Sequence, residues 1–585
     1  MNDTPPVLIV GAGPTGLALA AQLASFGVPF RLVDRSLDRA HESRALGVQA
    51  RTLELLQPYD LADALVARGN STATLRFHFE SGGSTGFRLS DFGAGDTRFP
   101  FILFVSQAET EALLGEHLTA RGVAIERGVE LVAYDTDEEG VDVTLRHSDG
   151  AEERVRAQYL VGCDGAHSTV RRLAAIPFEG DAYEQRFMLG DVEADAEGDA
   201  LQRDTLHFFP GRYGVAVFFP LGRPATWRVI AMSTRTSPVR VSSEHDEDRQ
   251  PMATPLTLDQ LQRAVDDATG GGVRVRDPAW LAHFRLHHRQ ASHYSARRIF
   301  IVGDAAHIHS PVGAQGMNTG MQDAWNLGWK LAFVLRGAAR AALLDTYEAE
   351  RWPVGHALLR GTDRIFALFT RAMSSNSAVA WLRRVLLPRL VPLAIGGERL
   401  RTFAFRFVSE IGIEYRDGPL ATEGTPALSE GPRAGERLPD APVRVAGHAS
   451  TLQRELVGPW LTLLLCDRTL RTEYADDDRS RGALPRDLLR VRRLVSSAAS
   501  AGTADDLPTL AGRADDLPAS AGTADDLPAS AGTADDLIDE SGVALERLGV
   551  RDRAIYLVRP DGYIAYRCAG MEFPGVQEWL ETLRS

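Results

Sequence analysis

Cysteine is scarce in this sequence. Only three occur among 585 residues, Cys163, Cys466 and Cys568, and no two of them form a CxxC pair. Widely spaced single cysteines support neither a disulfide scaffold nor a thiolate zinc site. We therefore expect the protein to work in a reducing compartment, the cytoplasm.

Long apolar runs are also missing. No stretch offers the roughly twenty uncharged apolar residues that a membrane-spanning helix needs. The N-terminal run in MNDTPPVLIVGAG follows no basic residue and is too short for a signal peptide. Residues 378–397 (AVAWLRRVLLPRLVPLAIGG) are basic and apolar, and we interpret them as a packed helix interrupted by proline, with membrane-surface contact as the alternative.

Positive charge is not in excess. The formal net charge of −14 argues against a nucleic-acid-binding protein. Half of that charge comes from residues 501–537, which repeat a ten-residue unit of the form AGTADDLPAS and contain four Asp-Asp pairs offset by Arg513. Each unit is rich in small and polar residues, which predicts a disordered insertion over 499–537, with partner binding as the alternative.

Residues 7–35 (VLIVGAGPTGLALAAQLASFGVPFRLVDR) carry the clearest local pattern. They contain an apolar strand at Val7–Val10, a G-x-G-x-x-G motif at Gly11, Gly13 and Gly16, a helix to about Phe26, and a strand that ends at Asp34. In such a motif the glycines allow a tight turn, close approach of a pyrophosphate and close packing of the helix on the strand. The helix N-terminus attracts the phosphates, and the acid binds a ribose. The pattern predicts a dinucleotide site without distinguishing FAD from NAD.

Two further segments end an apolar run in a small acidic loop. In AQYLVGCDGAHSTVRR (157–172) the strand leads to Asp164, and a helix is expected near Ser168. In IVGDAAHIHSPVGAQGMNTG (301–320) the strand leads to Asp304, and a helix is expected after the glycines. Ligands of such sheets bind beyond the carboxyl ends of the strands, so all three segments are candidates for one site.

Asp304, His307 and His309 also allow a different interpretation, a 2-His-1-carboxylate metal site. A metal site of that kind would not need the dinucleotide fold. We therefore favour small residues that let the backbone lie flat against a large cofactor, and we interpret His307 as packed or hydrogen-bonded. His309 is a candidate for the substrate side.

Together these segments resemble the single-component FAD-dependent aromatic hydroxylases, which are para-hydroxybenzoate-hydroxylase-like, and within them the phenol and aromatic polyketide hydroxylases. The resemblance covers about residues 5–360. It implies an α/β fold with a Rossmann-type FAD-binding domain, an antiparallel-sheet substrate domain and a thioredoxin-like C-terminal domain. The implied ranges are 1–185 and 286–360 for the FAD-binding domain with a substrate-side excursion at about 75–100, 186–285 for the substrate sheet, 361–410 for a helical connection, and 411–585 for the C-terminal domain with its insertion.

The resemblance also implies which residues contact FAD. Arg44 lies in its arginine segment (43–56), Gln107 in its glutamine-helix segment (106–114), and the loop from Pro311 would line the flavin ring. The complete implied set is Gly11, Gly13, Thr15, Gly16, Asp34, Arg35, Arg44, Gln107, Asp164, Asp304, Gly313, Gly316, Met317 and Asn318. No catalytic side chain is identified, but Pro311 and His309 are flavin-proximal candidates, and no metal is expected.

The remaining chain gives a coarser pattern. Residues 204–232 alternate apolar and polar positions and predict antiparallel strands with tight hairpins. Residues 459–467 and 554–568 predict strands, the second a hairpin, and 431–443 look like a linker that enters the C-terminal domain. Because this domain has no CxxC, we expect it to pack or to dimerise rather than to exchange electrons.

The family implies a chemistry in which NADPH or NADH reduces FAD, and O2 then forms a flavin C4a-hydroperoxide that hydroxylates an aromatic ring. We hypothesise a phenolic or polyketide-like substrate. The alternatives are a Baeyer–Villiger-type or drug-inactivating monooxygenase on the same scaffold, and a flavin-binding protein without oxygenase turnover. A homodimer is one assembly that the sequence allows.

Overall fold

The computed structural model describes residues 5–39, 45–71, 74–79, 82–88, 95–198, 201–211, 213–221, 225–233, 255–308, 315–372, 389, 397–468, 488–496 and 536–584. The chain divides into two compact units, Met1–Ile413 and Glu414–Ser585. The C-terminal unit thus begins within three residues of position 411, where the sequence places the start of the last domain.

A six-stranded sheet forms the centre of the first unit, in the order β17-β18-β11-β1-β2-β7. Its strands are β1 (Val7–Val10), β2 (Phe30–Asp34), β7 (Ile125–Arg127), β11 (Tyr159–Gly162), β17 (Ser295–Ala296) and β18 (Ile299–Ile301). All neighbours run parallel except β17 and β18. Parallel sheets are covered on both faces, and every residue of β1 is accordingly buried.

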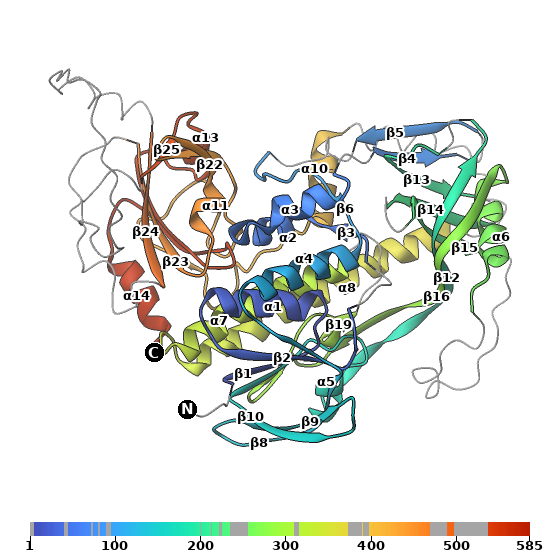
Figure 1. The fold of residues 1–585 in the computed structure, drawn as a ribbon. Helices are drawn as coiled ribbons and strands as arrows, with labels where there is room; N and C mark the ends of the chain where they lie inside the picture. The colour runs from blue at the N-terminus through green and yellow to red at the C-terminus, as the bar shows by residue number, and fades with distance from the viewer. Residues whose placement is uncertain are drawn as a thin grey trace, which may run out of the picture. The chain divides into compact units, whose positions relative to one another are not determined.

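Helices cover one face of this sheet and a small antiparallel sheet covers the other (Figure 1). The helices are α1 (Pro14–Ser25), α4 (Gln107–Ala120) and α7 (Gly316–Leu335), and the small sheet contains β8 (Val129–Thr136), β9 (Val141–His147) and β10 (Glu152–Ala157). Helix α7 lies closely on α1, since a Cβ atom at Gly328 would be 2.0 Å from Gln22 Oε1. The predicted strand–helix–strand unit at 7–34 and the helix after residue 315 are both confirmed.

The first unit contains a separate eight-stranded sheet of order β19-β16-β12-β15-β14-β13-β4-β5. Its strands are β4 (Thr74–His78), β5 (Ser84–Arg88), β12 (Phe178–Ala196), β13 (Thr205–Pro210), β14 (Gly214–Pro220), β15 (Trp227–Ser233), β16 (Val273–Ala291) and β19 (His307–Ile308). The antiparallel pairs β13–β14 and β14–β15 confirm the prediction for 204–232. Strands β4 and β5 from the early excursion extend the sheet beyond β13.

One face of this sheet is covered by helix α6 (Leu258–Thr269), which starts with a capping box between Thr257 and Gln260. The core under α6 includes Phe209, Phe218 and Trp227. The remaining elements of the unit are β3 (Gly47–Val48), β6 (Leu103–Phe104), α2 (Ala50–Leu56), α3 (Leu61–Arg68), α5 (Thr169–Leu173), α8 (Asp345–Ala372), α10 (Glu398–Val408) and the 3₁₀ turns Gln57–Tyr59, Gly303–Ala305 and Ala341–Leu344.

The second unit is built on a mixed sheet of order β20-β27-β26-β23-β24-β25-β21-β22. Its elements are β20 (Thr422–Glu423), β21 (Pro442–Val445), β22 (His448–Thr451), α11 (Leu452–Leu456), β23 (Leu461–Asp467), β24 (Leu489–Ser496), β25 (Asp536–Asp539), α13 (Val543–Arg547), β26 (Arg553–Val558), β27 (Ile564–Ala569) and α14 (Pro574–Thr582). Strand β23 runs parallel to β24 and antiparallel to β26, which pairs with β27 as the predicted hairpin.

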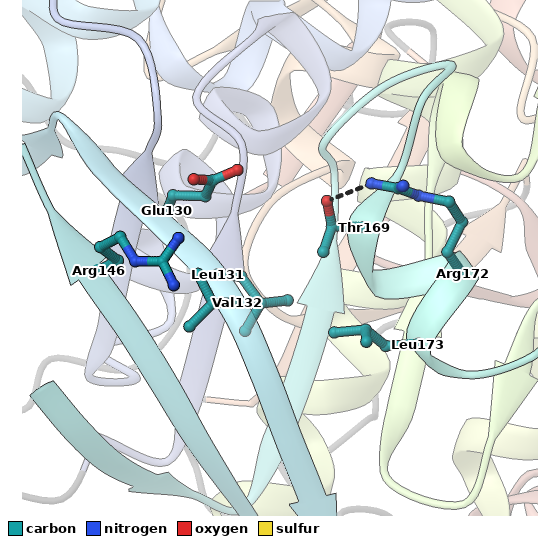
Figure 2. Close-up of a pocket in the computed structure, with 7 residues that line it drawn as sticks. All are labelled: Glu130, Leu131, Val132, Arg146, Thr169, Arg172 and Leu173. Carbon is teal, nitrogen blue, oxygen red and sulfur yellow. Dashed lines mark hydrogen bonds between the residues drawn. The ribbon is translucent and has the colours of Figure 1, made fainter. Parts of the chain in front are cut away.

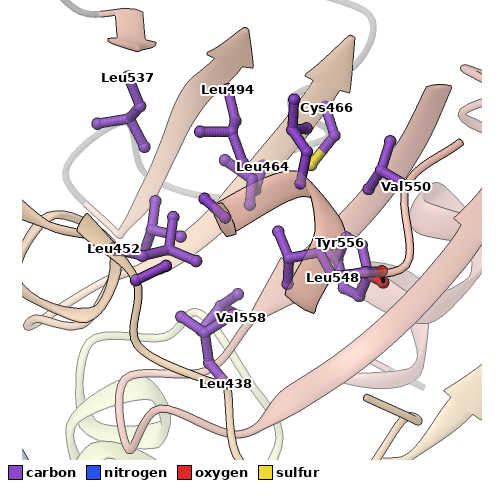
Figure 3. Close-up of a cluster of buried hydrophobic side chains, with 14 of the residues drawn as sticks. Leu438, Leu452, Leu464, Cys466, Leu494, Leu537, Leu548, Val550, Tyr556 and Val558 are labelled. Atoms are coloured by element: carbon purple, nitrogen blue, oxygen red, sulfur yellow. Dashed lines mark hydrogen bonds between the residues drawn. The ribbon is translucent and has the colours of Figure 1, made fainter. Parts of the chain in front are cut away.

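The core of this unit corrects two sequence predictions (Figure 3). Residues 431–443 are not a linker, because Leu438, Ala441 and Val443 belong to the buried cluster. The predicted insertion 499–537 ends too late, because Asp536 and Leu537 lie in β25 and the Leu537 side chain is fully buried. Glycine and proline mark turns inside a domain as readily as linkers between domains, which explains the first error.

Across the part of the chain that the structure describes, no helix combines the length and the apolar character needed to cross a membrane.

Candidate functional site

The three predicted segments end at one edge of the central sheet. Strand β11 lies between β1 and β18, and all three run parallel. The register pairs Val10 with Gly162, and Gly162 with Ile301, so the loops that follow these residues leave the sheet side by side. This edge is the position at which open α/β sheets bind their ligands.

Direct contacts fix these loops to one another. Gly11 has a φ of +104°, and a Cβ atom there would be 2.3 Å from the carbonyl oxygen of Cys163. The Thr15 hydroxyl group would be 2.7 Å from a Cβ atom at Gly303 and 2.8 Å from one at Gly320. Side chains at these three glycines would therefore force the loops apart.

The other two glycines of the G-x-G-x-x-G motif differ in what surrounds them. A Cβ atom at Gly16 would be 1.9 Å from the carbonyl oxygen of Gly11, so helix α1 needs glycine there to pack. Gly13 has a φ of −78°, which any residue adopts, and a Cβ atom there would meet nothing within 4 Å among the residues that the structure describes. The protein alone does not need glycine at position 13, and the open space beside it fits a pyrophosphate at the N-terminus of α1.

Asp34, at the end of β2, is tied to the same loop. Its carboxylate accepts hydrogen bonds from the backbone N–H of Ala12 (2.7 Å) and of Ser36 (2.8 Å), and Arg127 Nη1 lies 3.6 Å away. The side chain is 14% exposed, so it remains accessible to a ribose beside the loop. The neighbouring Arg35 is exposed.

Asp164 makes hydrogen bonds within its own loop. One carboxylate oxygen accepts from Ser168 Oγ (2.5 Å), and the other accepts from the N–H groups of Thr169 (2.7 Å) and Val170 (3.1 Å) at the start of α5. The helix that the sequence places near Ser168 is confirmed, with Ser168 as its N-cap. These bonds shape the loop, and a cofactor contact of Asp164 stays a prediction.

Arg171 joins the second and third loops, which the sequence did not reveal. Its guanidinium group donates to the carbonyl oxygens of Ala166 and Ala305, both at 2.8 Å, and lies over the ring of Phe178. The side chain is buried, and a carbonyl-bound arginine in this position holds the ends of β11 and β18 together. The sequence around it (STVRRL) contains two adjacent arginines and does not indicate which of them is buried.

Helix α7 begins beside these loops at Gly316, followed by Met317 and Asn318. The first N–H groups of a helix have no acceptor within the helix and carry its positive end. The side chain of Asn318 is buried and binds the protein itself: it accepts from the N–H of Gln49 (2.8 Å) and from Thr52 Oγ1 (2.8 Å), and it donates to the Gly47 oxygen (2.9 Å). A cofactor could therefore use the helix end but not this amide.

The predicted glutamine-helix segment adjoins the same region. Gln107 is the first residue of α4, and its Oε1 accepts a long hydrogen bond from the N–H of Ala45 (3.4 Å). Asp304 lies in the 3₁₀ turn after β18 and is exposed. Arg44, His309, Pro311 and Gly313 lie outside the described residues, so their predicted roles stay predictions.

A buried ionic network holds the loop after β18 against α7 and α8. Asp323 Oδ2 is 2.7 Å from His307 Nε2 and accepts from the N–H of Gly303 (3.2 Å), while Asp323 Oδ1 is 2.5 Å from Arg351 Nε. Burial alone would raise the pKa of Asp323, but Arg351 and His307 outweigh it and lower that pKa. The prediction that His307 is a packed, hydrogen-bonded residue is confirmed. No group of side chains with metal-ligand geometry occurs among the described residues.

A separate cavity of about 390 Å³ lies beside β8, β9 and α5 (Figure 2). Its wall contains two guanidinium groups, but Arg172 donates to Thr169 Oγ1 (3.0 Å) and Arg146 pairs with Glu152 (3.2 Å). None of the predicted cofactor-binding residues lines this cavity. We assign no ligand to it.

Comparison with known proteins agrees with this geometry. Residues 4–362 match the protein family described as FAD binding domain. The chain is 37% identical over 476 residues to 6-methylpretetramide 4-monooxygenase of Streptomyces rimosus, with 80% of each chain covered. It is 36% identical over 414 residues to rifampicin monooxygenase of Streptomyces venezuelae, with 70% of this chain and 80% of the relative covered. Its fold matches that of CabE, an aromatic hydroxylase from angucycline biosynthesis, with a TM-score of 0.71 at 26% identity over 99% of each chain.

Proposed function

We propose that this chain, which belongs to the FAD binding domain family and is an FAD-dependent monooxygenase, hydroxylates an aromatic small molecule with NAD(P)H and O2. The sequence resemblance and the family match cover the same part of the chain, residues 4–362. Within the aromatic class, we propose a phenolic or polyketide-like substrate, because the chain is similar to 6-methylpretetramide 4-monooxygenase and to an aromatic hydroxylase from angucycline biosynthesis.

One observation carries the proposed cofactor site. Three parallel strands deliver their loops to one edge, and at that edge a Cβ atom at Gly13 would meet no atom of the described residues within 4 Å. A diphosphate fits beside Gly13, where the positive end of α1 begins, and Asp34 fits a ribose. We propose that Asp304, which is exposed, binds hydroxyl groups of the ribityl chain.

When bound, FAD supplies the redox and oxygen chemistry that amino-acid side chains lack. The contribution of this chain is to bind and orient. The first turn of α7 offers N–H groups and a positive helix end, which stabilise negative charge placed there by about 0.3–1 kcal/mol or more when buried. Asp323 of α7 fixes the position of the helix, because its buried carboxylate is bonded to the buried side chains of His307 and Arg351.

The eight-stranded sheet provides the proposed wall for the substrate. The face opposite α6 carries Phe208, Val217 and Ile230, which are apolar yet only partly buried. The same face packs through Leu206 against Leu46 and Phe104 of the FAD-binding part. Partly buried apolar side chains are typical of the lining of small-molecule sites, and a planar aromatic ring would cover them.

For the second unit we propose a thioredoxin-like fold without redox activity. The order β24-β23-β26-β27, with one parallel and two antiparallel pairs, is the arrangement that supports it. Cys466 and Cys568 are buried, and burial raises the pKa of both thiols, so neither is a reactive thiolate. Packing or homodimerisation remains the proposed role of this unit, and a cytoplasmic location is part of the same proposal.

A second candidate is oxygenation of a drug-like compound, including Baeyer–Villiger-type insertion, on the same scaffold. The similarity to rifampicin monooxygenase is the observation that supports it. Hydroxylation keeps the ring connectivity of the product, whereas insertion of oxygen into the ring changes it, so the two are separated by the structure of the product.

Three measurements on the purified protein test the proposal. We expect a bound flavin spectrum, O2 consumption with NADPH or NADH that increases with a subset of a phenol and polyketide panel, and a product 16 mass units heavier, the mass of one oxygen atom. The variant Val217→Phe should raise KM for the substrate without changing the flavin content. A protein that contains no flavin, or that consumes no O2 with any compound of the panel, would refute the proposal.

A further inference from the structure

Glu410 is a buried carboxyl group that the proposed chemistry does not use. It follows helix α10 and is 1% exposed. Its backbone has a φ of 61°, in the left-handed region that glycine and asparagine adopt far more readily than glutamate. A charged residue type in a strained backbone conformation and without access to water requires a specific reason.

The contacts of Glu410 are with the beginning of helix α7. Thr319 Oγ1 donates to Glu410 Oε1 at 2.8 Å, and the side-chain amide of Gln322 bonds to Glu410 Oε2. Thr319 and Gln322 belong to the first two turns of α7. Thr319 is three residues from Gly316, a rise of about 4.5 Å along the helix, so the carboxyl group lies near the positive end of α7.

Neighbouring backbone groups extend this contact into a clasp, which we define as residues 407–410. The Phe407 oxygen accepts from Gln315 Nε2 (2.8 Å), and Gln315 is the N-cap of α7. The Ser409 oxygen accepts from the N–H of Arg51 in α2 (3.2 Å). The clasp therefore binds the end of α7 that the proposed function places at the flavin.

The charges around Glu410 come from several elements. Arg351 of α8 favours its carboxylate, while Asp323 of α7 opposes it. Arg51 of α2 forms a buried pair with Glu54, and Arg406 of α10 pairs with Asp96. Burial is the largest effect and raises the pKa of Glu410 to about 8. Burial therefore favours the neutral form of the Glu410 carboxyl group.

The hydrogen bonds and burial act in opposite directions on Glu410. The hydrogen bonds from Thr319 and Gln322 favour the carboxylate, and so does the charge of Arg351. Burial of the side chain, which is 1% exposed, outweighs them, because two neutral donors do not replace the water that a carboxylate loses.

We propose that Glu410 is a positioning residue of the cofactor site, which holds the start of α7 as a neutral acid and, when it loses its proton to solvent, opposes negative charge at that helix end. This inference rests on the proposed function, because it requires the reduced flavin to lie at the start of α7. Linkage is reciprocal, so negative charge on the reduced flavin must in turn hold the proton on Glu410.

Proton uptake during reduction tests the inference in the FAD-loaded protein. Anaerobic reduction in weakly buffered solution, with a pH indicator, gives the number of protons bound per flavin. As the pH rises through 8, the number of protons that wild type takes up per reduced flavin should increase by up to about one. The reason is that the oxidised protein has then lost the Glu410 proton, whereas the reduced protein keeps it. Spectroelectrochemistry should show a reduction potential that falls more steeply with pH in the same range.

Glu410→Gln keeps the size and hydrogen bonds of the side chain but cannot ionise, so both additional effects should disappear. The matched control is Glu139→Gln, which removes an exposed carboxyl group in the turn between β8 and β9 and should behave as wild type. Identical proton uptake in Glu410→Gln and wild type would overturn the inference. A protein without bound flavin would instead overturn the proposed function, so the two failures are distinct.

Thr319→Val provides a second variant if Glu410→Gln does not fold. It removes a hydrogen bond that favours the carboxylate and substitutes a side chain of equal size. The additional proton uptake should therefore begin at a higher pH than in wild type. An unchanged onset would overturn the inference as clearly as an unchanged Glu410→Gln variant.

Discussion

Alanine at position 13 is the most direct test of the cofactor site, because only a ligand requires glycine there. The backbone of Gly13 has a φ of −78°, and an added Cβ atom would meet no atom of the described part of the chain within 4 Å. Gly13→Ala should therefore leave the flavin-free protein intact and weaken only the binding of FAD. Gly16→Ala is its matched counterpart three residues away, since its Cβ atom would be 1.9 Å from the Gly11 oxygen.

The expected magnitudes differ enough to be measured. Alanine in place of glycine at a helix N-cap costs at most about 1 kcal/mol. For a unit of 413 residues, an unfolding entropy of about 2.1 cal/mol/K per residue converts that cost into a shift of about 1 °C in Tm. A methyl group in space that the pyrophosphate occupies should cost about 1–3 kcal/mol of binding, or roughly 5- to 150-fold in Kd.

Two assays on the deflavinated protein separate these effects. Thermal melting reports the stability of the first unit, and quenching of flavin fluorescence during titration reports the Kd for FAD. Gly13→Ala should melt with wild type and bind FAD weakly, whereas Gly16→Ala should already melt several degrees lower without FAD. If Gly13→Ala binds FAD with the wild-type Kd, no phosphate lies beside Gly13 and the proposed placement of the cofactor is wrong.

Three further substitutions test the supporting structure. The pKa of Glu410 is raised in the folded protein, so the wild-type protein loses stability as the pH rises from 4.5 to about 8. Glu410→Gln cannot ionise, so its free energy of unfolding should exceed that of wild type by an amount that grows over this pH range and then stays constant. The upper limit of this difference is on the order of 5 kcal/mol. A constant difference in urea titrations at pH 5 and pH 8 would contradict the shift. Arg351→Met leaves Asp323 buried without its main partner and should cost about 3–5 kcal/mol by the same titration at pH 7, and a loss below 1 kcal/mol would mean that the pair is not buried as described. Leu537→Ala should lower the unfolding free energy of the second unit by about 2–5 kcal/mol. Deletion of 499–534 should leave the melting temperature and the turnover unchanged. If both changes had the same effect, Leu537 would belong to the insertion and not to the core.

The sequence predicted the elements whose signals are local. The G-x-G-x-x-G motif, the strands before it and after it, and the helix between them lie within 7–35, and each has a recognisable pattern. The loops at Asp164 and Asp304 were found for the same reason, since each directly follows a short apolar strand. Their convergence also followed from the sequence, because carboxyl ends of parallel strands meet at one edge.

The partners inside the site were not predictable, because they are distant in the chain. Glu410 bonds to Thr319 across 91 residues, and Arg351 bonds to Asp323 across 28. Asp323 is the one acidic residue of α7, and Arg351 lies among the acidic residues that open α8, but neither pattern identifies a partner. The linker assigned to 431–443 failed because its glycine and proline residues mark turns inside the domain, while the apolar residues Leu438, Ala441 and Val443 between them are buried in the core.

The division of hydrogen bonds at the sheet edge indicates how the site is prepared for its cofactor. Asp164, Arg171 and Asn318 bind groups of the protein, and each of them joins or shapes a loop. The features that we propose for the cofactor itself are the position beside Gly13 and the positive end of α7. A site whose polar side chains already have partners does not reorganise when the ligand arrives, and less of the binding free energy is then lost to ordering. Substitution of Asn318 should therefore weaken FAD binding through the loops it holds, whereas Gly13→Ala acts on the ligand alone.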